Sequence, residues 1–314
     1  MTLHIGYTFY LFVRHFETPG YPYVVRPPAV DAFLPIAGMM SFKYFLFTGT
    51  VEPVHPSAFI MFTAIIGVSF FLKKGFCGWI CPIGTISQYF WMAGEKVFGR
   101  NPGMRRYADI SLRSVKYILM SFFILIIWVR MSAPVLRGFF LSDYYKIADI
   151  KTMKFFAGMS AATFWFLAGT AGLSLIYKNF WCRYLCPYGA LLGLVSRLSP
   201  VKIRRIEENC SHCRACSRNC PALIDVEKQG AVKSAECFGC MTCVSRCPSK
   251  GALDVSLGAG SRRRPFSPYL YAAALVLLFT FIIGVGITAG TWRSQIPYGE
   301  YQRIIPGASH LDHP

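Results

Sequence analysis

Long apolar blocks, separated by short polar and basic segments, dominate the hydrophobic pattern of this chain. Four such blocks lie at residues 54–72, 115–136, 155–177 and 269–290. The last two are uncharged and long enough to cross about 30 Å of hydrocarbon as helices. The second includes Lys116 and Arg130, whose charged ends we expect to reach the lipid headgroups. The pattern therefore predicts four membrane-spanning helices.

Two shorter apolar stretches near the N-terminus do not fit a full span. Leu3–Val13 is too short to cross, so residues 1–13 are interpreted as a partial or truncated span, with the true N-terminus upstream of Met1. Phe33–Phe47 carries Lys43 near its middle. We expect this second stretch to be interfacial or re-entrant.

Charge supports a membrane assignment and gives it a direction. The chain is 54% hydrophobic and only 15% charged, with a formal net charge of +18. Residues 14–52, 130–154 and 292–314 net about +3, whereas residues 73–116 and 178–264 carry the remaining +15. The positive-inside rule places the second group in the cytoplasm. The basic residues flank apolar helices, which indicates contact with anionic membrane lipid and argues against nucleic acid.

Eight of the twelve cysteines lie in one polar, basic segment and form two C-x2-C-x2-C-x3-C-P motifs, beginning at Cys210 and Cys237. This spacing is typical of bacterial two-cluster ferredoxins, in which three cysteines of each motif bind one [4Fe-4S] cube and the fourth binds the other cube. Zinc would need paired C-x2-C motifs, and disulfides are disfavoured in the cytoplasm. The predicted ligands are Cys210, Cys213, Cys216 and Cys247 for one cluster, and Cys237, Cys240, Cys243 and Cys220 for the other.

The other four cysteines form a repeated C-x3-C-P element. Cys77 and Cys81 follow one apolar block, and Cys182 and Cys186 follow another about a hundred residues later. Both blocks are predicted to run inward, so two parallel repeats could bring the four sulfurs together at the cytoplasmic boundary marked by Lys73. Three interpretations stay open: a third metal or redox centre, a reversible dithiol pair, and a packing turn with small buried cysteines.

With both sets of motifs identified, the chain resembles the polyferredoxin-type membrane proteins. These are related to the quinol-dehydrogenase subunit of periplasmic nitrate reduction (the NapH type) and to the membrane part of the nitrous-oxide-reduction regulator NosR. The resemblance rests on the order of the motifs, with Cys77-Cys81-Pro82 and Cys182-Cys186-Pro187 ahead of the two ferredoxin motifs. It implies an inner-membrane electron-transfer protein that exchanges electrons with quinone and with a redox partner protein. The block at 269–290 has no counterpart in the nitrate-reduction subunit, so the identity of the partner does not carry over.

Together these observations predict an α-helical polytopic membrane protein with an inserted cytoplasmic α+β module of the bacterial 2[4Fe-4S] ferredoxin type. The predicted parts are a membrane domain at 1–198, a two-cluster module at 199–257, a basic linker at 258–268, a C-terminal span at 269–290 and an outer tail at 291–314. The favoured function is electron transfer between a quinone or membrane donor and a redox partner. The alternative is a maturation or regulatory protein, which would reduce a metal or sense redox state during assembly of a respiratory enzyme.

Overall fold

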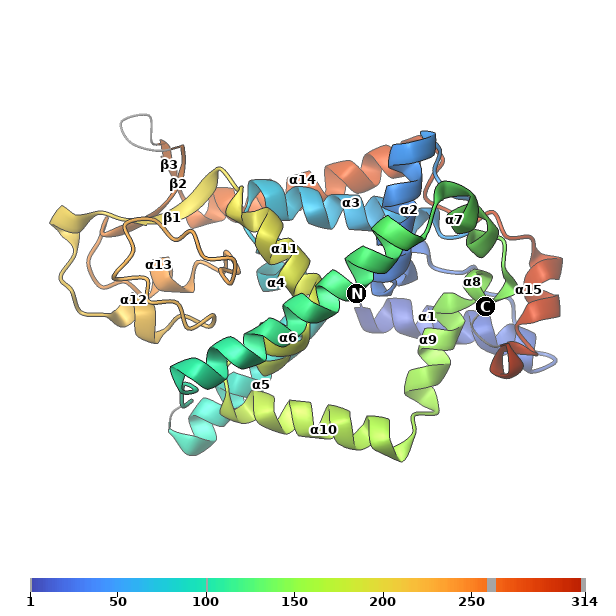
Figure 1. The fold of residues 1–314 in the computed structure, drawn as a ribbon, viewed down its shortest axis with the longest axis horizontal. Helices are drawn as coiled ribbons and strands as arrows, with labels where there is room; N and C mark the ends of the chain where they lie inside the picture. Colours follow the sequence, from blue (N-terminus) through green and yellow to red (C-terminus); the bar gives the residue numbers. More distant parts are fainter. Residues whose placement is uncertain (1, 100, 259–263, 312–314) are drawn as a thin grey trace. The chain divides into compact units, whose positions relative to one another are not determined.

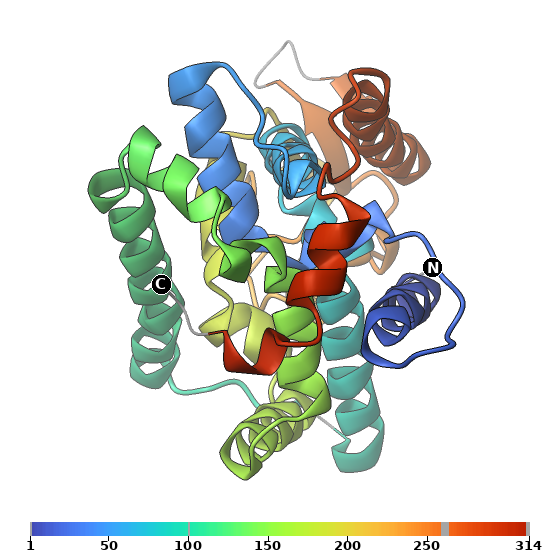
Figure 2. The same cartoon turned by 90° about the vertical axis from the view of Figure 1, so that its right-hand side faces the viewer.

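The computed structural model describes residues 2–99, 101–258 and 264–311 and is mostly helical (Figures 1 and 2). The chain divides into two compact units. Unit 1 contains the chain up to Ala64, Phe122–Thr163 and the chain from Phe281 onward, and unit 2 contains Ile65–Ser121 and Phe164–Thr280. The segments that the charge pattern assigned to the outer side all belong to unit 1, and those assigned to the cytoplasm all belong to unit 2.

The boundaries between the units fall within four helices, one for each predicted apolar block. These are α3 (Pro56–Phe71), α6 (Arg106–Ile124) with the π-helical turn η2 (Leu125–Arg130), α10 (Ala161–Ile176) and α14 (Pro268–Thr288). Among the described residues, α6 with η2 and α14 are long and apolar enough to cross a membrane. Helix α10 also qualifies when it is joined to α9 (Ala148–Ala157), from which it bends by 81°.

Two of the helix boundaries differ from the expected spans. The block predicted at 115–136 is helical from Arg106 to Arg130, and an extended residue, Met131, separates it from the next helix. The block predicted at 155–177 is interrupted after Ala157, where Gly158 ends α9. The apolar pattern alone does not reveal either break, because apolar residues occur on both sides of each one.

Unit 1 is a set of short helices around its own apolar core. Besides its parts of the four shared helices it contains α1 (Thr2–Glu17), η1 (Pro28–Phe33), α2 (Pro35–Thr48), α7 (Ala133–Phe140), α8 (Asp143–Lys146), α9, α15 (Tyr298–Ile304) and η6 (Ala308–His310). Phe12, Ile147, Ile150 and Ile305 are almost completely buried in the core. The stretch predicted as a partial span is thus the beginning of α1, and its apolar side packs on α9 and α15 residues.

Lys43, the charge that interrupts the apolar stretch at 33–47, lies inside unit 1 on α2. Its ammonium group donates hydrogen bonds to the carbonyl oxygens of Ile127 (2.9 Å), Trp128 (3.1 Å) and Met131. The last carbonyls of a helix have no partner within the helix. Lys43 therefore caps the C-terminal end of η2, and this contact explains why a lysine occurs in an apolar sequence.

Unit 2 combines helices with a small antiparallel sheet. Its helices are α4 (Gly75–Trp79), α5 (Pro82–Phe98), the π-helical turn η3 (Trp181–Leu185), α11 (Pro187–Arg197), η4 (Glu207–Asn209), α12 (Ala215–Arg218) and α13 (Thr242–Ser245), and its strands are β1 (Val201–Arg205), β2 (Leu253–Leu257) and β3 (Arg264–Phe266). The strand order is β1-β2-β3. Residues 259–263 of the predicted basic linker lie outside the described residues, and the part that follows forms β3.

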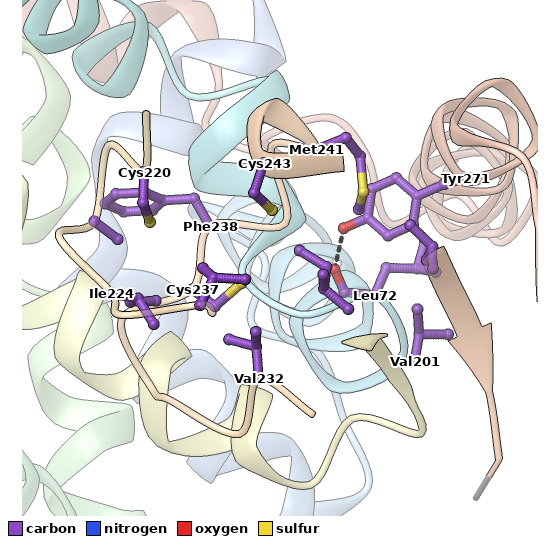
Figure 3. Packing of buried hydrophobic residues seen from close by; sticks show 14 of the residues in the cluster. Leu72, Val201, Cys220, Ile224, Val232, Cys237, Phe238, Met241, Cys243 and Tyr271 are labelled. Carbon is purple, nitrogen blue, oxygen red and sulfur yellow. Dashed lines mark hydrogen bonds between the residues drawn. The ribbon is translucent and has the colours of Figure 1, made fainter. Parts of the chain in front are cut away.

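The core of unit 2 joins the cysteine-rich module to the ends of two shared helices. Tyr271, in the first turn of α14, is fully buried, and its hydroxyl donates to the carbonyl oxygen of Leu72, just after α3 (Figure 3). Leu72, Phe76 and Leu275 belong to the same apolar cluster as Val201 and the buried cysteines. The module is therefore packed directly onto helix ends and is not suspended on a linker.

A buried network of charges in unit 1 connects η1 and α9 to the segments that precede η1 and α3. The Arg26 guanidinium donates to Asp149 (2.7 Å) and to Asp31, and Asp31 also contacts His55 (3.1 Å). All four side chains are buried. Burial disfavours ionisation of Asp31, but the guanidinium outweighs this effect and holds the pKa of Asp31 well below its usual range. The Arg26 group occupies the position of a cation among the three possible metal ligands.

Replacing Arg26 by methionine should destabilise unit 1 by about 3–5 kcal/mol, because two buried carboxylates would lose their counter-charge. Chemical denaturation of the detergent-solubilised protein measures this change in the free energy of unfolding. Arg303→Met is the control, because Arg303 forms an exposed pair with Asp143 (2.9 Å) that should contribute less than about 1 kcal/mol. Equal effects of the two substitutions would contradict a special role for the buried network.

Candidate iron-sulfur sites

The two ferredoxin motifs fold their backbones in the same way. In the first motif His212 and Arg214, on either side of Cys213, have φ angles of 54° and 60°. In the second motif Gly239 and Met241, on either side of Cys240, both have φ angles of 61°. Residues other than glycine rarely adopt these left-handed φ angles. Turns that contain such residues can direct backbone N–H groups toward an anion. Both loops are therefore shaped around their central cysteine.

Each motif contains one turn of helix that carries its third cysteine. Cys216 lies in α12 and Cys243 in α13, and both thiols are buried. Arg214 and Met241 are the residues that immediately precede these helices. The left-handed residue thus sets the direction in which the third cysteine points, and the sequence spacing C-x2-C-x2-C follows from this turn.

The structure brings Cys220 from the end of the first motif to the cysteines of the second. Cys220, Cys237, Cys240 and Cys243 line one cavity together with Phe238 and Ile224. Figure 3 shows Cys220, Cys237 and Cys243 among the buried side chains of this region. Burial raises the pKa of Cys243, and the neighbouring thiols Cys237, Cys240 and Cys220 raise it further. This grouping is the one that crossover ligation requires.

The remaining ferredoxin cysteines lie on a more open side of the module. Cys247, the last cysteine of the second motif, is close enough to Cys216 that the charge of one acts on the other. Cys213 is exposed, and Cys210 and Cys247 are half-buried. The two predicted ligand sets therefore differ in environment, one enclosed by apolar side chains and the other facing outward.

The two C-x3-C-P elements are structural copies. In both, the amide of the second cysteine donates across five residues to the residue before the first cysteine, from Cys81 to Phe76 (2.9 Å) and from Cys186 to Trp181 (3.0 Å). The second cysteine then caps a helix whose first residue is proline, Pro82 or Pro187. Proline suits this first position because its missing N–H would have no partner there.

All four C-x3-C-P cysteines lie together in unit 2. Burial raises the pKa of Cys182, and the neighbouring thiols Cys186, Cys77 and Cys81 raise it further. Burial likewise raises the pKa of Cys77 to about 12. Cys186 Sγ accepts a hydrogen bond from the Gly189 amide (3.2 Å) at the N-terminus of α11, where a helix favours negative charge. The sequence prediction that parallel repeats bring these cysteines together agrees with this arrangement.

Both copies pack against the same group of ferredoxin cysteines. From the first copy, Trp79 Nε1 donates to the carbonyl oxygen of Gly239 (3.0 Å), beside Cys240. From the second copy, Asn179 Nδ2 donates to the carbonyl oxygen of Pro221 (3.1 Å), beside Cys220. A small cavity is lined jointly by cysteines from both copies and by Cys240. The C-x3-C-P site therefore adjoins the enclosed ferredoxin group.

Comparisons with known proteins agree with these sites. A model described as a 4Fe-4S binding domain matches residues 54–103 and 159–206, which contain the two C-x3-C-P copies, and a 4Fe-4S dicluster domain model matches residues 202–248. The YccM protein of Escherichia coli K12, named as a candidate electron transport protein, is 42% identical over 317 residues, covering 100% of this chain and 88% of YccM. The chain belongs to the polyferredoxin-type family of 4Fe-4S proteins.

More distant relatives match part of the chain. The ferredoxin-type protein NapH of Haemophilus influenzae is 26% identical over 201 residues, or 61% of this chain and 63% of NapH. The regulatory protein NosR of Pseudomonas aeruginosa is 25% identical over 221 residues, or 67% of this chain and 29% of NosR. No solved structure matches the chain.

This polyferredoxin also buries three lysines beside its cysteines, and sequence reasoning missed them. Lys73 and Lys74 are each 1% exposed, and neither ammonium group has a hydrogen-bond partner among the described residues. Lys116, expected at the headgroups, is fully buried, and its ammonium group lies 2.7 Å from both carboxylate oxygens of Glu236. Lys73, predicted to mark the cytoplasmic boundary, is buried within unit 2. The pair of lysines shortly before the Cys77 motif is the sequence feature that could have indicated these buried charges.

The side chains present fit iron-sulfur cubes. Each site offers four cysteine sulfurs, the ligands that such clusters use. A cube with four thiolates is an anion, and burial of an ammonium group without an anion is unfavourable. Burial lowers the pKa of Lys73 to about 8, which indicates how poorly the protein alone stabilises this charge. An anionic group at the adjacent cysteines would supply the missing partner.

Gly84, in the first C-P-x-G sequence, provides a test of this packing. A Cβ at Gly84 would overlap the carbonyl oxygen of Cys77, whereas a Cβ at the equivalent Gly189 would meet its nearest atom at 3.5 Å, an ordinary contact. Gly84→Ala should destabilise unit 2 by about 1–3 kcal/mol and lower the iron content per chain. Gly189→Ala should keep the wild-type iron content. Iron analysis and denaturation measure both effects, and loss of iron in both variants alike would contradict the asymmetry.

Proposed function

We propose that this protein is a membrane-bound iron-sulfur electron-transfer protein that connects the quinone pool or another membrane donor to a redox partner protein. The observation that carries the proposal is the packing of three cysteine groups within one compact unit, where the C-x3-C-P site adjoins the enclosed ferredoxin group. The name of YccM refers to electron transport, and NapH is named as a ferredoxin-type protein. These names support the same chemistry for this chain.

The proposed ligands are three sets of four cysteines. They are Cys77, Cys81, Cys182 and Cys186; Cys237, Cys240, Cys243 and Cys220; and Cys210, Cys213, Cys216 and Cys247. When bound, iron-sulfur clusters accept and donate single electrons. The protein encloses the second set with apolar side chains and leaves the third set more exposed. This gradient of exposure supports a partner that docks on the side of Cys213.

We propose that the four shared helices cross the bacterial inner membrane, with unit 2 on the cytoplasmic side. The charge pattern supports this direction, since the segments with the larger basic excess all belong to unit 2. Helices α6 with η2 and α14 have the length and hydropathy of spans. The bend between α9 and α10 would let α9 lie along the membrane surface while α10 enters it.

A cavity in unit 1 supports the quinone part of the proposal. It has a volume of about 810 Å³, within the usual range for small-molecule sites, and is lined mainly by apolar and aromatic side chains such as Phe33 and Met40. Tyr145 lies in its wall and donates a hydrogen bond to Glu52 (3.1 Å). Burial raises the pKa of Glu52, so its carboxylate would be a better proton acceptor than an exposed one.

A maturation or regulatory role is the second candidate. It is favoured by the match to NosR, which is named as a regulatory protein. A deletion strain in which a respiratory enzyme fails to acquire its metal, while quinol-dependent electron flow is unchanged, would support this candidate over electron transport.

The number of iron atoms tests the three proposed sites. Anaerobically purified protein should contain about twelve iron and twelve sulfide ions per chain, since each of three cubes holds four of each. Replacing Cys77, Cys81, Cys182 and Cys186 by serine should lower both counts to about eight. Chemical analysis and EPR measure these values. A count of about eight in the unchanged protein would remove the third centre and leave the ferredoxin clusters.

Glu52→Gln tests the proton-accepting role in unit 1. Reduction of the clusters by a soluble quinol analogue should slow by about 100-fold, while reduction by dithionite and the iron content stay as in the unchanged protein. Lys151→Gln is the matched control for altered binding, because Lys151 lines the same cavity and its ammonium group donates a hydrogen bond to the carbonyl oxygen of Leu311. A quinol rate that is the same in Glu52→Gln and in the unchanged protein would contradict the assignment.

A further inference from the structure

The buried lysines of unit 2 form an excess of positive charge that the proposed function does not yet use. Lys74 and Lys116 share the buried carboxylate of Glu236, and the ammonium group of Lys73 has no hydrogen-bond partner among the described residues. Both oxygens of Glu236 bind Lys116 at 2.7 Å, and one of them is 3.9 Å from Lys74. One carboxylate therefore faces two ammonium groups, and the third, that of Lys73, has no acidic partner among the described contacts, so buried positive charge exceeds buried negative charge here.

Lys74 lies between two of the cysteine groups. Its carbonyl oxygen accepts a hydrogen bond from the amide of Cys77 (3.0 Å), the first cysteine of the C-x3-C-P site. Its ammonium nitrogen is 5.0 Å from the centre of the Phe238 ring, in the loop between Cys237 and Cys240. Phe238 in turn lines one small cavity together with Cys77, Cys182 and Cys240. Lys74 is thus placed to act on both sites at once.

We propose that Lys74 is a shared counter-ion of two iron-sulfur centres, the one held by the C-x3-C-P cysteines and the one held by Cys220, Cys237, Cys240 and Cys243, and that it raises the reduction potential of both. The inference rests on the proposed function, because it requires both centres. One-electron reduction adds one negative charge to a centre without making or breaking a bond, and a neighbouring centre supplies the electron. A buried cation stabilises that added charge strongly, because the surroundings are poorly polarisable.

A shared counter-ion has a consequence for electron exchange. If Lys74 favours reduction of both centres, the reduction potentials of both shift in the same direction. The free-energy change for electron transfer between the two centres then stays small. Of the proposed ligands of the remaining cluster, Cys213 is exposed, Cys210 and Cys247 are half-buried and Cys216 is buried, so solvent and salt reach this site more readily and weaken the effect of a distant charge. Lys74 should therefore separate this outer cluster from the other two in potential.

The test is a redox titration followed by EPR on the full chain, purified anaerobically in detergent. Lys74→Met should lower the equilibrium constant for one-electron reduction of each of the two adjoining centres at least tenfold, which corresponds to a fall in reduction potential of about 59 mV. The potential of the outer cluster should shift by clearly less. Lys228→Met is the matched control, because Lys228 is an exposed lysine of the same module paired with Asp225 (3.3 Å). It should leave the two adjoining potentials unchanged.

Glu236→Gln provides a second variant with the opposite sign. Removing the carboxylate frees the charges of Lys74 and Lys116, so the same two potentials should rise. This variant keeps the inference testable if Lys74→Met does not assemble its clusters. Unchanged potentials in the variants that retain iron, or equal shifts of all three centres, would overturn it. A wild-type iron count of about eight would instead contradict the third centre itself, and the count is made before any titration.

Discussion

Buried positive charge beside buried sulfur is the constraint on which unit 2 depends. Without clusters, burial raises the pKa of Cys77 and lowers that of Lys73, so each group resists the charged form it would need. With a cube bound, the thiols are deprotonated and the resulting anion stabilises the ammonium groups. Cluster insertion and charge burial therefore support each other, and we infer that unit 2 reaches its stable fold together with its metal.

The same electrostatic rule explains the charges inside unit 1. Lys43 is stabilised by the free carbonyl oxygens at the end of η2, and Arg26 by two buried carboxylates. Removing one member of such a set leaves the others buried and unpaired, which costs more than an exposed pair contributes. An apolar chain can bury these charges because each of them binds an element far away in sequence. These contacts also fix which segments pack together, which apolar packing alone would not specify.

The cysteine spacing made part of this arrangement predictable. A motif of fixed spacing describes local backbone, so the loops around Cys213 and Cys240 and the duplicated C-x3-C-P turns follow from short stretches of sequence. Lys116 was interpreted as a headgroup contact because its partner, Glu236, lies 120 residues away and no periodic pattern links them. The strand β3 was likewise hidden in a basic linker, since three residues are too few for an alternating pattern.

The duplicated turns have equivalent backbones, but each turn contacts a different segment of the ferredoxin module. The first copy holds the loop at Gly239 and the second holds the segment at Pro221, and these two segments carry ligands of the same predicted cluster through crossover. The predicted crossover thus lets both copies of the C-x3-C-P turn contact segments that carry ligands of the same cluster. If all four cysteines of each motif bound the same cluster, Cys220 and Cys240 would bind different clusters. The two copies of the turn would then contact segments of two clusters instead of one. The predicted crossover in the module and the duplication of the C-x3-C-P turn are therefore consistent with one arrangement.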